Sequence, residues 1–427
     1  MTAVRVGVAC QDVMVPVGTP MAGFAARLGP STGVHDLVTV RALAFDGGVA
    51  LVSVDVCSLH ERTCEKIRAV AGNHVIVTAT HTHSGPCVSF ERLGTHAEGV
   101  HDAIVAAALA AVSEARASAV PCRMLYGEAS GGGVAKNRRH PDRVIDPPVQ
   151  ILAFAPEKPI GPADEAAHYL AHLITYPCHP VVLDGLNRQI SGDYPAFLRA
   201  GVEETFPGSV CIFATGCAGD VNTGHSAAAS FTPTGGGMRT FAEAKRIGAL
   251  LARAVAGATM QELPTSAVQV DHGSVALPLQ MLTEETVRTQ RAEWARQLDE
   301  ASDPGLRMLL ELWIAWADAW EPGYQPEWPA RISLLTIGEV SIVALPGEPF
   351  WATACRICEQ GTGPTLVLGY ADGVPGYIPP ADECQYGGYE VCDAHRYYAM
   401  PAPFAAGAAD RLEQAVEVLD AAARHHH

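Results

Sequence analysis

The sequence predicts a mixed α/β fold, a large domain whose mixed sheets are flanked by helices. Strand and helix patterns alternate along the chain, glycine-turn hairpins precede helical segments, and no low-complexity stretch interrupts them. The 427 residues are enough for more than one average domain, but no linker divides them. We therefore expect a single domain over residues 1–424 and assign the histidines at 425–427 to a purification tag.

The first half of the chain opens with a predicted hairpin, in which two β-branched runs flank the turn Asp46-Gly47-Gly48. Helices are expected where apolar residues recur with helical spacing or where alanine is abundant. The expected strands are 38–45, 49–56, 75–80, 149–154, 172–176 and 210–214, and the expected helices are 61–71, 100–116, 194–205 and 241–256.

The second half repeats the opening pattern. Strands at 332–337 and 340–345 flank the turn Gly338-Glu339, and a helix follows from about residue 350. This echo predicts two similar halves. An amphipathic helix is expected at 408–424.

A helical hairpin is expected between the halves, with helices at 284–299 and 305–320. Trp313, Trp316 and Trp320 lie at i, i+3 and i+7 on the second helix, so they share one face, and tryptophans in this pattern are usually core residues. We expect segment 283–329 to be a helical insertion near the functional site that shapes the pocket entrance.

Composition excludes several classes of partner. The net charge is −17 without any run of basic residues, which argues against nucleic acid or an anionic membrane surface as a partner. No apolar run is long enough to span a bilayer, and the N-terminus lacks the apolar stretch of a secretion signal. The 12 cysteines are scattered rather than arranged as a disulfide framework, so we expect a cytoplasmic protein.

The strongest functional signal is the sequence His81-Thr82-His83-Ser84-Gly85-Pro86, directly after the apolar run 75–80. In an extended chain residues i and i+2 point the same way, so both imidazoles are expected to face one site. Two imidazoles at a strand end are a good start for a zinc site. An exposed polar loop is the alternative.

Further candidate residues also follow predicted strands. His179 stands in a rigid turn between two prolines, and Glu348 stands between Gly347 and Pro349 at a strand exit, where a carboxylate is a candidate metal ligand. The glycine-rich loop 215–224 permits close approach of the backbone to a ligand, and its amides are candidate oxyanion donors. A tyrosine-rich segment at 376–390 ends the series.

Taken together, these features resemble the catalytic domain of the neutral ceramidases, zinc-dependent amidohydrolases. The similarity covers about residues 4 to 405, and its motifs follow the family's order and spacing. The matching motifs are Met21-Ala22-Gly23-Phe24, Gly33-Val34-His35-Asp36-Leu37, Arg41-Ala42, His81 to Pro86, Asn137-Arg138, Cys178-His179-Pro180, Ala218-Gly219-Asp220-Val221, Leu345-Pro346-Gly347-Glu348, and Tyr377 with Tyr389.

The resemblance implies a role for each matched residue. One zinc ion per chain would be held by His81, His179, Glu348 and Tyr377. In the family the second histidine is the general base and acid, which assigns that role to His83 here. The resemblance makes Arg138 and Tyr389 the groups that orient the substrate carbonyl and stabilise the oxyanion. The loop residues Gly219, Asp220 and Asn222 would lie beside the substrate.

The chain also departs from the family. Asn222 replaces the serine of the Gly-Asp-Val-Ser loop, and Cys87 replaces the glycine after Pro86. A C-terminal immunoglobulin-like domain and a secretion signal are not seen, so ceramide is a less suitable substrate than a small soluble amide. We therefore expect a zinc hydrolase that cleaves an amide C–N bond with metal-activated water.

Alternatives remain open at the level of sequence. The same site would suit an ester, a lactone, or a cyclic amide or imide, because these carbonyls need the same oxyanion geometry. A non-catalytic metal- or ligand-binding protein is a second alternative, and a β/α barrel with a two-metal site is a third. The early hairpins break the strand–helix alternation that a barrel needs. The sequence does not indicate an oligomeric state.

Overall fold

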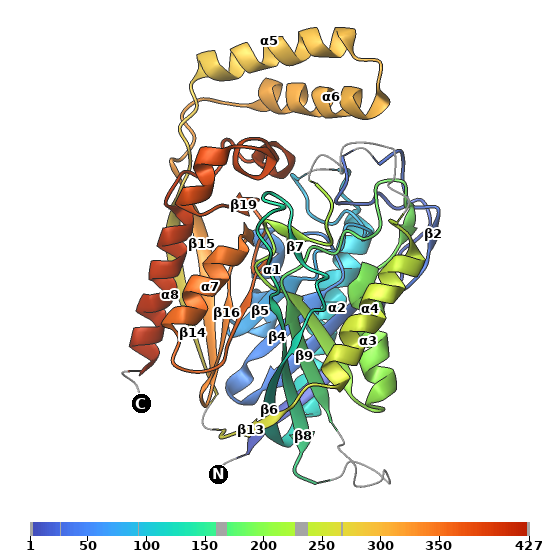
Figure 1. Cartoon of the computed structure of the whole chain (residues 1–427), viewed down its shortest axis with the longest axis vertical. Coiled ribbons are helices and arrows are strands. Elements are labelled where there is room, and N and C mark those ends of the chain that lie inside the picture. Colours follow the sequence, from blue (N-terminus) through green and yellow to red (C-terminus); the bar gives the residue numbers. More distant parts are fainter. Residues whose placement is uncertain are drawn as a thin grey trace.

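Two stacked β-sheets form the centre of the computed structural model, and helices cover their outer faces (Figure 1). The structure describes residues 3–25, 27–92, 94–158, 169–226, 238–265 and 268–424, so the tag assigned at 425–427 lies outside the described residues. The observed order of mixed sheets and helices is the predicted α/β class, and the β/α barrel is excluded.

The larger sheet has nine strands in the order β11-β9-β8-β6-β1-β3-β4-β5, with β13 paired to β6. It is mixed: β3 and β4 form the predicted hairpin, whereas β4 pairs with β5 and β9 with β11 in parallel. The strands are β1 (Val4–Val13), β3 (Val38–Phe45), β4 (Ala50–Val54), β5 (Val75–Ala79), β6 (Val120–Ser130), β8 (Pro148–Pro156), β9 (Ala171–Tyr176), β11 (Val210–Thr215) and β13 (Gln261–Leu263).

The smaller sheet has the same strand connectivity as the β3-β4-β5 edge of the larger sheet. The repeated hairpin pattern in the sequence predicts this similarity. Its four strands run β14-β15-β16-β18, and β16 pairs in parallel with β18 just as β4 pairs with β5. Each parallel pair is joined through one helix. The strands are β14 (Val268–Pro278), β15 (Glu327–Ile337), β16 (Val340–Ala344) and β18 (Thr365–Leu368).

The layers follow the order helix, sheet, sheet, helix. Apolar side chains of both sheets fill the space between them, and this explains why β4 and β5 are buried along their whole length. One set of helices covers the outer face of the larger sheet: α1 (Glu61–Ala71), α2 (Glu98–Ala117), α3 (Asp193–Thr205) and α4 (Phe241–Ala256). The smaller sheet is covered by α7 (Trp351–Gln360) and α8 (Ala408–Arg424).

The predicted helical hairpin is present as α5 (Glu284–Glu300) and α6 (Pro304–Ala319), beyond the ends of the sheets (Figure 1). Trp294 and Trp316 belong to the small core between these two helices. The Trp316 ring nitrogen donates to the Met400 carbonyl at 2.9 Å, so the hairpin is fastened to the segment before α8. In the same segment the Arg396 guanidinium carbon lies over three indoles, at 4.7 Å from Trp294 and Trp313 and 5.5 Å from Trp316.

The strands β1, β6, β13, β14 and β18 were not predicted from the sequence. β14 is an edge strand in which few side chains are buried, and β6 contains a proline and a glycine, so neither shows a clean apolar run. None of the helices in the described part of the chain is both long and apolar enough to cross a bilayer.

Candidate metal centre

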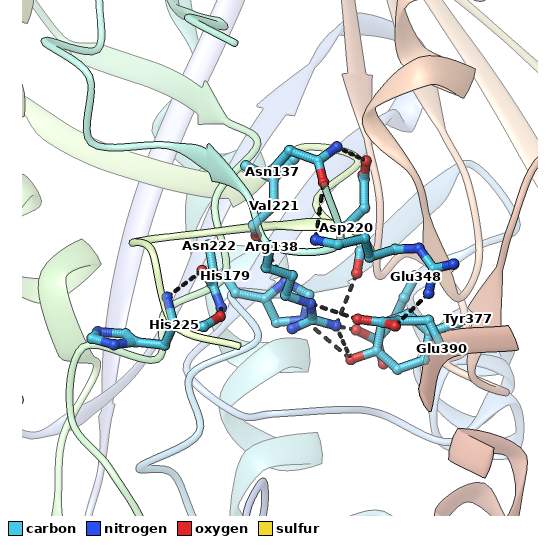
Figure 2. Close-up of polar contacts among 12 residues, drawn as sticks. Asn137, Arg138, His179, Asp220, Val221, Asn222, His225, Glu348, Tyr377 and Glu390 are labelled. Atoms are coloured by element: carbon cyan, nitrogen blue, oxygen red, sulfur yellow. Dashed lines mark hydrogen bonds and ion pairs between the residues drawn. The ribbon is translucent and has the colours of Figure 1, made fainter. Parts of the chain in front are cut away.

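The side chains predicted as metal ligands meet in one buried place. His81 follows β5 and His179 follows β9, whereas Glu348 and Tyr377 begin the two-residue strands β17 (Glu348–Pro349) and β19 (Tyr377–Ile378). Oε2 of Glu348 lies 2.9 Å from Nε2 of His179 and 3.2 Å from Nε2 of His81. The Tyr377 hydroxyl lies 3.4 Å from Nε2 of His179 (Figure 2). All four predicted ligand atoms therefore face a common point.

Backbone carbonyls fix the orientation of both imidazoles. Nδ1 of His81 donates to the Cys57 carbonyl at 2.6 Å, and Nδ1 of His179 donates to the Ala218 carbonyl at 2.7 Å. A carbonyl oxygen only accepts, so each Nδ1 carries a proton, and each Nε2, which points toward Glu348, is the nitrogen available to a metal ion. Two imidazole nitrogens and one carboxylate oxygen within 4.8 Å of one another make a donor set that fits zinc.

Burial and neighbouring charges both shift the pKa values of the predicted ligands. Burial acts to raise the pKa of Glu348, but the His81 and His179 rings hold it well below the usual value, so the carboxylate is ionised. Burial lowers the pKa of His179 to about 4, which keeps that ring neutral. Burial raises the pKa of Tyr377, and the Arg138 guanidinium opposes that rise.

A pair of short strands sets the relative position of two predicted ligands. β17 and β19 pair in parallel, with Glu348 directly opposite Tyr377. Opposed residues on paired strands point to the same side, so both side chains approach the histidines together. Gly347 before the pair has φ +70, and a Cβ there would lie 2.7 Å from the Gly376 carbonyl, so only glycine fits without movement of the backbone.

The backbone at His81 corrects the geometry expected from the sequence. β5 ends at Ala79, and His81 has φ +63, a left-handed conformation rather than an extended one. The two imidazoles nevertheless face each other, with Nε2 of His83 3.2 Å from Nε2 of His81. The two imidazoles therefore converge because the backbone turns at His81, a residue that is fully buried. A left-handed backbone at a non-glycine residue is strained, and such strain is frequent at functional sites.

His83 lies at the edge of the ligand group and lines the cavity. The Arg27 guanidinium donates to the His83 carbonyl at 2.6 Å, and the Phe24 ring packs edge-on against the imidazole. Burial, with the neighbouring His81 and His179 rings, holds the pKa of His83 well below its usual value. The ring is therefore neutral and able to accept a proton.

Arg138 connects the predicted ligands to a buried acidic group (Figure 2). Its Nη2 donates to the Tyr377 hydroxyl at 3.0 Å and to the Gly219 carbonyl at 2.9 Å, and its Nε pairs with Glu390 at 2.8 Å. Tyr389 packs edge-on against Tyr377 and lines the same cavity. The structure thus brings both predicted orienting residues to the ligand group.

The loop predicted to lie beside the substrate makes its described contacts with neighbouring segments. Asn222 bonds with its side chain to the backbone of Gly224 and His225, away from Glu348 (Figure 2). Asp220 accepts from Asn137 at 2.9 Å and from the first amide of α7 at 2.8 Å. The Gly219 amide donates to the Pro349 carbonyl. These groups hold neighbouring loops together, and their contact with a substrate stays a prediction.

The cavity beside the ligand group is narrow, with a volume of about 50 Å³. The lining combines small residues with four tyrosines, two arginines and His83. The lining residues are Ala22, Gly23, Ala25, Cys57, Ser58, His83, Arg92, Arg138, Val181, Tyr377, Tyr389, Tyr397 and Tyr398. In the described chain, α5 and α6 contribute none of them, and the role of segment 283–329 at the pocket entrance stays a prediction.

Sequence reasoning missed Tyr398, whose hydroxyl donates to Oε1 of Glu348 and leaves Oε2 for the histidines. Nothing in its sequence context marks it, because the contact joins segments 50 residues apart.

We expect Tyr398→Phe to lower the affinity for zinc by about 10- to 100-fold, because the hydrogen bond that orients the carboxylate is lost. Competition with a chromophoric chelator measures this affinity. Tyr397→Phe, a neighbour that lines the same cavity, is the matched control. Equal zinc affinity in the Tyr398 variant and the unmodified protein would show that Tyr398 does not position Glu348.

Comparison with solved structures shows what fold this site belongs to. A neutral ceramidase from Pseudomonas aeruginosa matches with a TM-score of 0.73 and 18% identity, over 100% of this chain and 75% of that chain. This chain has the neutral-ceramidase fold. A ceramidase solved in complex with C2 matches with a TM-score of 0.71 and 17% identity, over 100% of this chain and 76% of that one. Models of known protein families and curated protein sequences give no match.

The neutral-ceramidase-like fold predicted from the motifs is therefore confirmed over the whole chain. The individual site residues remain assignments by motif and geometry.

Proposed function

We propose that this protein is a zinc-dependent hydrolase that cleaves the amide C–N bond of a small substrate. The observation that carries the proposal is the convergence of Glu348 with His81 and His179 beside a neutral His83, within a fold shared with ceramidases. Arg138 and Tyr389 beside the same cavity favour catalysis, because a site that only binds metal would not need groups to orient a carbonyl.

Zinc bound by these residues would polarise a carbonyl oxygen and lower the pKa of a water molecule. His83 would accept the proton from the attacking water and then donate it to the departing amide nitrogen. Arg138 and Tyr389 would orient the carbonyl and stabilise the negative charge that develops on its oxygen. Because Glu390 pairs with Arg138, the guanidinium keeps a fixed position during this step.

Cavity size supports a small substrate. A volume of about 50 Å³ holds a small polar amide group, whereas the sites of drug-sized ligands usually exceed about 300 Å³. The lining includes four tyrosines and two arginines, which suits a polar acyl or amine portion. We further propose one zinc ion per chain and a reducing compartment such as the cytoplasm, since all 12 cysteines are free thiols.

Removal and restoration of the metal tests this proposal. Chelation should abolish hydrolysis of a panel of short-chain amides, and stoichiometric zinc should restore it. The panel includes matched esters, lactones, cyclic imides and a ceramide with a short acyl chain. Faster turnover of esters would reassign the bond that is cleaved, and absence of turnover for every carbonyl substrate would favour a non-catalytic binding protein.

We expect His83→Gln to lower kcat by about 10²- to 10⁴-fold while zinc content stays unchanged, because the variant loses the proton carrier and keeps the proposed ligands. Steady-state kinetics with metal analysis of the same sample measures both effects. A parallel loss of zinc would instead make His83 a metal ligand.

A further inference from the structure

A cysteine, Cys57, lies beside the candidate metal centre. Cys57 follows β4, and His81 follows β5, the parallel neighbour of β4 in the sheet. Because parallel strands end at the same edge, the two residues meet there, and Sγ of Cys57 lies 3.9 Å from Nδ1 of His81. Cys57 is 6% exposed and lines the cavity.

The thiol completes a second group of donor atoms. Sγ of Cys57, a ring nitrogen of His81 and a ring nitrogen of His83 all lie within 4.8 Å of one another. Nδ1 of His83 is buried and has no hydrogen-bond partner among the described residues, although its backbone carbonyl is held by Arg27. A buried imidazole nitrogen without a partner is costly unless a ligand or water satisfies it.

We propose that the cavity binds divalent metal ions in a second mode, through Cys57, His81 and His83. The two donor sets share His81, so one ion occupies one set at a time. Thiolate is a soft ligand, and soft ions such as Cd²⁺ prefer it to carboxylate, which directs them to Cys57 rather than Glu348.

The second mode has a consequence for the activity proposed above, on which this part of the inference rests. An ion bound in this mode occupies the imidazole of His83, which then cannot transfer a proton. Soft metal ions are therefore expected to be inhibitors of the hydrolase, even though they bind in the same cavity. Cys57 thus sets which ions support turnover.

Titration of Cd²⁺ into the metal-free protein tests the second mode without any measurement of activity. We expect a thiolate-to-metal absorption band in the ultraviolet that reaches its maximum when the cavity is filled. Cys57→Ser should remove the band and weaken Cd²⁺ binding at least about tenfold, because the remaining donors are harder. Cys87→Ser, another buried cysteine, should retain the band.

Each result of the Cd²⁺ titration supports or overturns the second mode of metal binding. Cd²⁺ binding without the band in the unmodified protein, or a band that survives Cys57→Ser, overturns the second mode and leaves the hydrolase proposal to its own chelation test. If no divalent ion binds, both proposals fail together. Cys57→Ala provides the same comparison if the serine variant does not fold, and circular dichroism checks the fold of each variant.

Discussion

Replacing His81 with alanine is expected to leave the protein without bound zinc and to lower hydrolytic activity by about 10³-fold or more. The imidazole supplies one of the nitrogen donors next to Glu348, and its loss leaves too few ligands to hold the ion against water. Metal analysis after gel filtration measures occupancy, and turnover of the best amide substrate measures activity.

A histidine away from the cavity provides the control for this experiment. His74 is exposed at the opposite end of β5, so His74→Ala should retain zinc and activity. Zinc retained at full occupancy in the His81 variant would contradict the ligand assignment. Zinc lost with the fold intact would support it, and a thermal melt of the metal-free proteins separates this outcome from simple unfolding.

Replacing Asp55 with asparagine is expected to destabilise the protein by about 3–5 kcal/mol, because Arg199 is left as an unpaired buried charge. The pair is bidentate, with both contacts at 2.7 Å, and it links the end of β4 to α3. Thr39 donates to the same carboxylate from its amide and its hydroxyl. Urea unfolding at neutral pH measures the free energy of unfolding.

The pH dependence of this effect has a definite sign. Burial acts to raise the pKa of Asp55, but Arg199 holds it below the unfolded value, so the pair stabilises the fold fully above the unfolded pKa. That contribution is lost as the pH falls through the folded pKa. The difference between Asp55→Asn and the unmodified protein should therefore shrink on acidification.

A surface pair serves as the control for the stability measurement. Glu243 pairs at 2.7 Å with Arg246, which is exposed on α4, so Glu243→Gln should change the free energy of unfolding by less than about 0.5 kcal/mol. A cost for Asp55→Asn as small as this would show that the buried pair adds nothing to stability.

Local signals were sufficient to predict much of the fold. The helices at 61–71, 241–256 and 408–424 have the predicted bounds, because each combines an apolar face with clear flanking residues. The strands buried on both faces were predicted from unbroken apolar runs, as in β5 and β11. Few side chains of β14 are buried, so this strand lacks the pattern and becomes visible only through its partner β15.

The candidate site was predictable where one residue stands at the exit of an apolar strand, as with His81 and Glu348. It was not predictable where a contact joins distant segments without a pattern. Tyr398 and Cys57 reach the site only through tertiary packing. The left-handed backbone of His81 also has no signature in the sequence.

Arg396 gives the helical hairpin a mechanical connection to the predicted metal ligands. Its guanidinium is held by the indoles of α5 and α6, and two residues later the Tyr398 hydroxyl touches Glu348. A displacement of the hairpin must either break the cation–π contacts or pull on the carboxylate. A movement of α5 and α6 is therefore expected to reach the proposed metal ligands through one contact, the hydrogen bond from Tyr398 to Oε1 of Glu348.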